Sequence, residues 1–245
     1  HLEQALAISR EVGRVRQQVG ALLNLAYENA DLQRHSRRLA CLHDALALAE
    51  RGAPADVAAQ VLNEIGATYR QLGRPRDAIA CHERALAVFR ERGIVRSQSV
   101  ALQNLGLAHA SLGDLAAAGR CFDELVDVIG PRGAPGDIAG ALLNQAWVRF
   151  LSGDPDGALR TLERAAAIAD TVESFILRNN VDNALGQLRL QRGDPDGAAA
   201  CFERALARGR GLPAALEQWR ALAGLARARE LQGRLREAAD LLATA

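Results

Sequence analysis

The chain has 245 residues, of which 49% are hydrophobic and only 4% aromatic, and its formal net charge is +1. A core with so few rings must be built from Ala, Leu and Val, which suits closely packed helices better than a β-sandwich. The small net charge gives no electrostatic reason to expect nucleic acid or an anionic membrane as a partner, and no stretch is apolar enough for a membrane span.

A repeat of 40 residues runs along the chain. Its clearest markers are five glycines, which are Gly73, Gly113, Gly153, Gly193 and Gly233. Each is followed five residues later by Ala and preceded seven residues earlier by Gly or Ala. Because internal repeats of this length are typical of solenoids, the period is the main evidence for the fold.

Each repeat is predicted to be a helix, a tight turn and a second helix. Apolar residues at helical spacing, such as Val57, Val61 and Ile65, precede the glycine. Glycine can adopt the left-handed conformation that ends a helix. Asp154 and Asp194 follow their glycines and are themselves followed by Pro, so we expect them to cap the second helix.

In chain order, the predicted first helices lie near 17–33, 57–72, 97–112, 137–152, 177–192 and 217–232. The predicted second helices lie near 36–51, 76–92, 116–129, 156–170, 196–209 and 236–245, and a lone helix precedes them at 1–12. Together they predict a single all-α domain over 1–245, with repeats near 17–51, 57–92, 97–130, 137–170, 177–210 and 217–245. Because no polar capping helix is evident at either end, we expect this domain to be a fragment of a longer protein.

The sequence Leu102-Gln103-Asn104-Leu105-Gly106, followed by Leu112-Gly113-Asp114, Ala118 and Phe122, resembles the tetratricopeptide repeat (TPR) signature. The resemblance covers essentially the whole chain. Typical repeats of this family have about 34 residues, so the longer unit here is similar to kinesin-light-chain-like repeats. It is also similar to the repeat domains of bacterial transcription regulators of the MalT and antibiotic-regulatory (SARP) kinds. The resemblance implies a right-handed superhelical solenoid of about six repeats, whose first helices line a concave groove.

Carried over position by position, the resemblance implies a ligand- or peptide-binding set on the first helices. Its members are Asn24, Tyr27, Asn63, Arg70, Gln103, Asn104, Leu143, Asn144, Trp147, Phe150, Asn183 and Gln187. Five of them are asparagines, one per repeat. An amide both donates and accepts hydrogen bonds, so a row of amides can hold the backbone of an extended peptide. The same side chains could instead bond neighbouring helices.

An apolar set lies on one predicted helix face. Leu143, Trp147, Phe150 and Leu151 are spaced so that they share a side of the first helix in the fourth repeat. Exposed large apolar side chains tend to mark binding sites, and Trp is enriched at binding hot spots. A slight rotation of the helix would instead bury both rings in the core.

A charged residue occupies a position that is Leu in other repeats. Asp182 stands where Leu62, Leu102 and Leu142 stand. Because a buried carboxylate is costly unless it is paired, we predict an ion pair with Arg149 or Arg189. The pair could be structural, or it could form the wall of a pocket for a small-molecule effector.

Cys41, Cys81, Cys121 and Cys201 fall at one position of the repeat. Stacked helices lie about 8–10 Å apart, beyond the reach of a disulfide. We therefore expect free thiols and a cytoplasmic protein. The neighbouring histidines lack zinc-ligand spacing, so no metal is expected. No nucleotide-binding or catalytic motif is present, and the sequence predicts no cofactor and no enzyme activity.

The sequence thus predicts a non-enzymatic scaffold that binds a protein or peptide in a concave groove. Its expected role is the interaction or sensor domain of a bacterial regulatory protein. Two alternatives stay open: a domain of a transcription regulator that senses a small-molecule inducer, and a self-association module that forms a homo-oligomer. The arginines of the last quarter of the chain could bind an acidic partner or nucleic acid, but their default interpretation is solvent exposure, so we do not expect nucleic acid as the partner of this domain.

Overall fold

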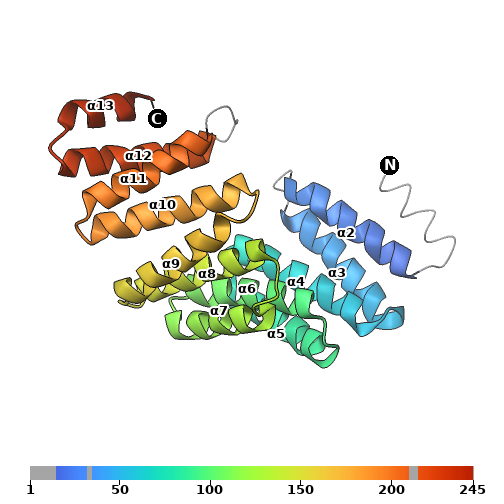
Figure 1. Ribbon diagram of the computed structural model, residues 1–245. Helices are drawn as coiled ribbons and strands as arrows, with labels where there is room; N and C mark the ends of the chain where they lie inside the picture. Colours follow the sequence, from blue (N-terminus) through green and yellow to red (C-terminus); the bar gives the residue numbers. More distant parts are fainter. Residues whose placement is uncertain (1–14, 32–34, 210–214, 245) are drawn as a thin grey trace. The chain divides into compact units, whose positions relative to one another are not determined.

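The computed structural model describes residues 15–31, 35–209 and 215–244. In these ranges every regular element is an α-helix, and the helices form sequential antiparallel pairs (Figure 1). This confirms the all-α prediction and its helix-turn-helix repeats. The predicted helix at 1–12 lies outside the described residues. None of the helices in the described ranges is both long and apolar enough to cross a bilayer.

The chain divides into two compact units, His1–Val128 and Ile129–Ala245. The helices of the first unit are α2 (Val15–Asp31), α3 (His35–Gly52), α4 (Ala55–Gln71), α5 (Pro75–Glu91), α6 (Val95–Ser111) and α7 (Leu115–Ile129). Those of the second unit are α8 (Pro135–Leu151), α9 (Pro155–Ala169), α10 (Phe175–Gln191), α11 (Pro195–Gly209), α12 (Ala215–Leu231) and α13 (Leu235–Thr244).

Each first helix begins two residues before its predicted start, while the ends agree within two residues. At α8 and α10 the reason is local. Pro135 occupies the first turn of α8, where its missing N–H costs no hydrogen bond. The Ser174 hydroxyl accepts a hydrogen bond from the Leu177 N–H at 3.4 Å and so caps α10.

The turns between paired helices have the predicted chemistry. Gly73 has φ of 71°, and the N–H of Arg74 returns to the carbonyl of Tyr69 at 2.8 Å, which closes the end of α4. Asp154 and Asp194 each accept a hydrogen bond at 2.8 Å from the backbone N–H three residues later. The predicted caps are therefore confirmed.

Close packing within a hairpin depends on a glycine facing a ring. A Cβ added at Gly106 of α6 would lie 2.8 Å from the Phe122 ring of α7. At Gly66 of α4 the added atom would lie 2.6 Å from the His82 ring of α5. Both rings are fully buried. The first helix therefore touches the ring with its own backbone, which a side chain would prevent.

The pairing of small and large buried residues recurs in the first five repeats. Gly66, Gly106 and Gly186 share a register position, and their partner sixteen residues later is a ring, namely His82, Phe122 and Phe202. Ala26 and Ala146 hold the same position in two other repeats, and there the residue sixteen positions later is the buried Leu42 and Leu162. One added methyl group is thus matched by a smaller partner, as close-packed interiors require.

We predict that Gly106→Ala and Phe122→Leu are strongly coupled. Gly106→Ala overpacks the interface and Phe122→Leu leaves a void, and each change lowers the unfolding free energy by about 1–3 kcal/mol. In Gly106→Ala, the better helix propensity of Ala recovers about 1 kcal/mol of this loss. The double variant recreates the pair Ala146 and Leu162. It should lose less unfolding free energy than the sum of the single losses, by about 1 kcal/mol or more. Denaturant unfolding of all four proteins measures this, and strictly additive losses would contradict the packing described.

Candidate functional site

The five predicted asparagines occupy two adjacent register positions rather than one. Asn24, Asn104 and Asn144 share a position, whereas Asn63 and Asn183 stand one residue earlier in their repeats. One residue turns a helix face by about 100°. Accordingly Asn24 is exposed, Asn104 and Asn144 are half-buried, and Asn63 and Asn183 are buried.

Asn63 is bound inside the first unit. Its Oδ1 lies 2.8 Å from Nδ1 of the buried His82 and 3.5 Å from Nδ2 of Asn104, which donates to it. Because Asn63 Oδ1 can only accept, the His82 proton resides on Nδ1. Nε2 of His82 is buried without a hydrogen-bond partner. The Asn63 oxygen thus joins α4, α5 and α6.

His82 is held neutral by its surroundings. Burial lowers the pKa of its imidazole to about 4, and the positive charge of Arg70 adds to the effect. His82 follows Cys81 directly, without zinc-ligand spacing. Its place in the register position of Phe122 and Phe202 is the signal that identifies it as a packed ring.

His82 should make the stability of the first unit depend on pH. Its folded pKa of about 4 lies below the ordinary 6.5, so the unfolded chain binds the extra proton and stability falls as pH drops from 6.5 towards 4. The loss attributable to His82 should approach about 3 kcal/mol. His82→Phe, which recreates the Asn183–Phe202 pair of the fifth repeat, should remove this component. Unfolding free energies of both proteins across this range measure the difference, and parallel profiles would refute the assignment.

Asn183 has a related position in the second unit. Its Nδ2 donates to Oδ1 of Asn179, also on α10, at 3.4 Å. Its own Oδ1 is buried and has no hydrogen-bond partner. The two buried asparagines of the predicted set, Asn63 and Asn183, therefore form hydrogen bonds inside their own units.

Asp182 is buried and ion-paired, but the predicted partners were wrong. Arg204 of α11 donates to Asp182 Oδ1 from Nη2 at 2.8 Å and from Nε at 3.1 Å. Arg149 instead donates to Thr161 Oγ1 at 3.2 Å, and Arg189 to the Gly197 carbonyl at 3.3 Å. The pair forms with the second helix of the same hairpin, whereas both predicted partners lie on first helices.

The second unit exposes large apolar groups on α8. Trp147 retains 44% of its accessible surface, and Leu151, one turn later, also retains 44%. Leu143, Asn144 and Phe150 are half-buried around them. On the opposite side of α8, Leu142, Ala146 and Val148 are buried in the unit's core. Gln187 of α10 is exposed at the register position that Trp147 holds in α8.

The remaining predicted residues lie in the first unit. Tyr27 of α2 and Gln103 of α6 are exposed, and Arg70 of α4 is half-buried with its Nε lacking a hydrogen-bond partner. The predicted set thus lies on first helices of both units.

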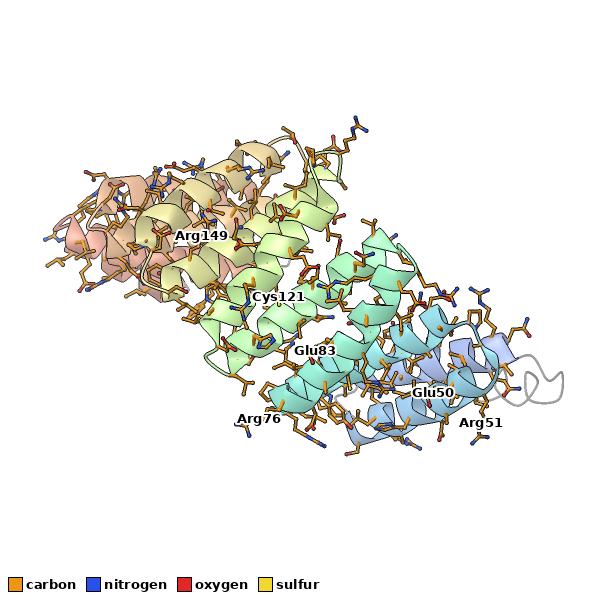
Figure 2. All side chains as sticks on the ribbon, turned by 90° about the horizontal axis from the view of Figure 1, so that it is seen from below. Glu50, Arg51, Arg76, Glu83, Cys121 and Arg149 are labelled. Atoms are coloured by element: carbon orange, nitrogen blue, oxygen red, sulfur yellow. The ribbon has the colours of Figure 1, made fainter. Side chains whose placement is uncertain are left out.

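The second helices carry charge on their outer sides. Figure 2 shows Glu50 of α3 and Arg76 and Glu83 of α5 among the charged side chains of the first unit, and all three are exposed. All four cysteines are free thiols, and burial raises the pKa of the Cys121 thiol to about 11. In the described ranges no three His, Cys, Asp or Glu side chains gather in a way that could hold a metal.

Comparison with known families identifies the repeats. One tetratricopeptide repeat model matches residues 17–91, and a second matches residues 63–138 and 183–245. The chain belongs to the tetratricopeptide repeat family. TPR domains are typically non-catalytic scaffolds, which agrees with the lack of enzyme motifs in the sequence. Among curated proteins, none matches this TPR chain.

Solved structures share the fold. BtubC (BKLC) from P. vanneervenii is 20% identical, with a TM-score of 0.76 over 84% of this chain and 87% of that one. A signal transduction ATPase with a TPR sensor from Pyrococcus horikoshii is 12% identical, with a TM-score of 0.80 over 95% of this chain and 36% of that one. A Rap protein complexed with competence and sporulation factor is 12% identical, with a TM-score of 0.73 over 92% and 66%. At these identities the likeness concerns the TPR fold.

Proposed function

We propose that this TPR chain is a non-enzymatic peptide- or protein-binding module and that Trp147 is its main anchor. The observation that carries the proposal is the exposure of the Trp147 ring beside Leu151 on a first helix. An exposed indole next to an exposed isobutyl group is an unfavourable surface in water, and a partner that covers both gains the free energy of their burial.

Polar groups on α8 and α10 suit the backbone of a peptide. Asn144 lies one turn before Trp147 on α8 and is only half-buried. Gln187 on α10 is exposed, and α10 packs against α8 within the second unit. Amides of this kind can donate to a peptide carbonyl and accept from a peptide N–H. In such a site the apolar anchor supplies most of the binding energy, and the flanking amides orient the peptide.

The structural neighbours favour a regulatory setting. The Rap protein was solved with competence and sporulation factor, and the Pyrococcus protein carries its repeats as a sensor. By analogy of fold, we infer that this chain acts as the interaction or sensor domain of a bacterial regulator. The analogy indicates the setting, whereas the exposed face of α8 indicates the site.

The test uses random short peptides displayed on phage, selected on the whole chain and then titrated as synthetic peptides. Trp147→Ala should weaken the selected peptides about 30-fold, because a buried hot-spot Trp contributes about 2 kcal/mol or more. Trp219→Ala is the matched control, since Trp219 lies on α12 of the same unit with 52% of its surface exposed. It should leave affinity within about twofold.

Two results would reject this function. One is a selection that yields no binding peptide. The other is a set of peptides whose affinity is unchanged in Trp147→Ala. Circular dichroism of both variants verifies that helix content is retained, so that a loss of binding reports the ring itself.

A further inference from the structure

One register position of the first helices changes its chemistry within the second unit. Trp147 of α8, Gln187 of α10 and Arg227 of α12 follow one another at intervals of 40 residues, and all three are exposed. In the first unit the same position holds uncharged residues, which are Tyr27, Ala67 and Leu107. Arg227 is therefore the one charged residue among the six.

Trp147, Gln187 and Arg227 emerge on the same side of their helices. α8, α10 and α12 begin and end at equivalent residues of the repeat, and each has 17 residues. The residue before each of the three is small and buried, namely Ala146, Gly186 and Ala226. Because α10 packs against both α8 and α12, the three side chains form a row that crosses neighbouring helices of one unit.

This row has the length of a short extended peptide. Packed helices lie about 8–10 Å apart, so the axes of α8 and α12 are at most about 16–20 Å apart. An extended chain advances about 3.3 Å per residue, and about five or six residues therefore span the distance from Trp147 to Arg227. A peptide whose apolar side chain meets Trp147 can pass Gln187 and reach α12.

α12 presents positive charge on the side that carries this row. Arg220 lies seven residues before Arg227, about two helical turns, so the two side chains share a face. Arg220 is also exposed. The other repeats hold uncharged residues at its register position, which are Gly20, Gln60, Val100, Gly140 and Asn180. At both positions only α12 is charged, and its charge is complementary to an acidic side chain.

In the free chain, Arg227 is paired with Glu230 of the same helix. Nη1 of Arg227 donates to Oε2 of Glu230 at 2.5 Å, and 59% and 51% of the two side chains are exposed. A pair as exposed as this contributes little net free energy, because water solvates both groups well when they separate. An acidic side chain of a bound peptide can therefore displace the Glu230 carboxylate from Arg227 at small cost.

We propose that Arg227 determines the specificity of the Trp147 site. It selects peptides that carry an acidic side chain about five or six residues from the apolar residue that meets Trp147. Glu230 weakens the binding of these peptides, because it competes with their carboxylate for the guanidinium group. This inference rests on the proposed function, since it names the class of peptide that the same site takes.

The probes are random peptides displayed on phage and selected in parallel on the wild-type chain and on Arg227→Gln. An acidic peptide from the wild-type selection is then synthesised with both ends capped, once with its Asp or Glu and once with Asn or Gln in that place. The wild type should bind the acidic form about fivefold more tightly, as an exposed charge pair can provide. Arg227→Gln should bind both forms equally, and its selection should show no enrichment in acidic residues.

Three further variants separate the pair from a general effect of charge. Glu230→Gln should raise the affinity for the acidic form about threefold and leave the neutral form unchanged, since it removes the competitor. Asp240→Asn removes an exposed anion from α13 of the same unit and should change neither affinity. Arg236→Gln removes an exposed cation from α13 and should keep the fivefold preference.

Each of four results would overturn the proposal. They are a wild-type selection without enrichment in acidic residues, equal affinities of the wild type for the two forms, an unchanged preference in Arg227→Gln, and an unchanged affinity in Glu230→Gln. If the peptides depend on Trp147 but give one of these results, only the selectivity of Arg227 fails. If neither selection yields a peptide, the peptide-binding function fails and the selectivity fails with it.

Discussion

The contact between a ring on a second helix and the bare backbone of a first helix governs this structure. Phe202 of α11 shows it most fully, because Cβ atoms added at Gly186 of α10 and at Gly224 of α12 would lie 2.6 Å and 2.4 Å from its ring. The Phe202 ring therefore packs against two successive first helices, α10 and α12, at the same time. Such contacts demand that the helices approach closely, and this is possible only where the facing residue is very small.

The orientation of a first helix follows from this contact, or from the buried alanine that takes the place of the glycine, and with it the division between buried and exposed positions. With Gly66 against the His82 ring, Asn63 lies close enough to bond His82 and is withdrawn from solvent. On α8, where Ala146 is buried in the equivalent position, Trp147 is the next residue and turns outward. The same rule thus buries one asparagine and exposes one tryptophan. The side chains that can bind a partner are those that this packing leaves exposed.

Much of the fold could be predicted from the sequence, because glycine and alanine positions repeat strictly and turn chemistry is local. The first-helix starts were predicted two residues too late, and at α8 and α10 the earlier start follows from Pro135 and from the Ser174 cap. The candidate site was less predictable. The asparagines were predicted as one row with one member per repeat, but their spacing is 39 or 41 residues between some repeats, and a shift of one residue separates a buried amide from an exposed one. Arg204 was missed as the partner of Asp182 because contacts within a hairpin depend on helix rotation, which periodicity alone does not specify.

The central claim is that the packing of α8 leaves Trp147 in solvent, available to a partner. Trp219→Phe leaves Trp147 as the sole tryptophan of the chain, so its fluorescence can be measured without interference. The account predicts the long-wavelength emission of a hydrated indole and efficient quenching by acrylamide. A short-wavelength emission that acrylamide barely quenches in the isolated protein would show a buried ring and would contradict the account.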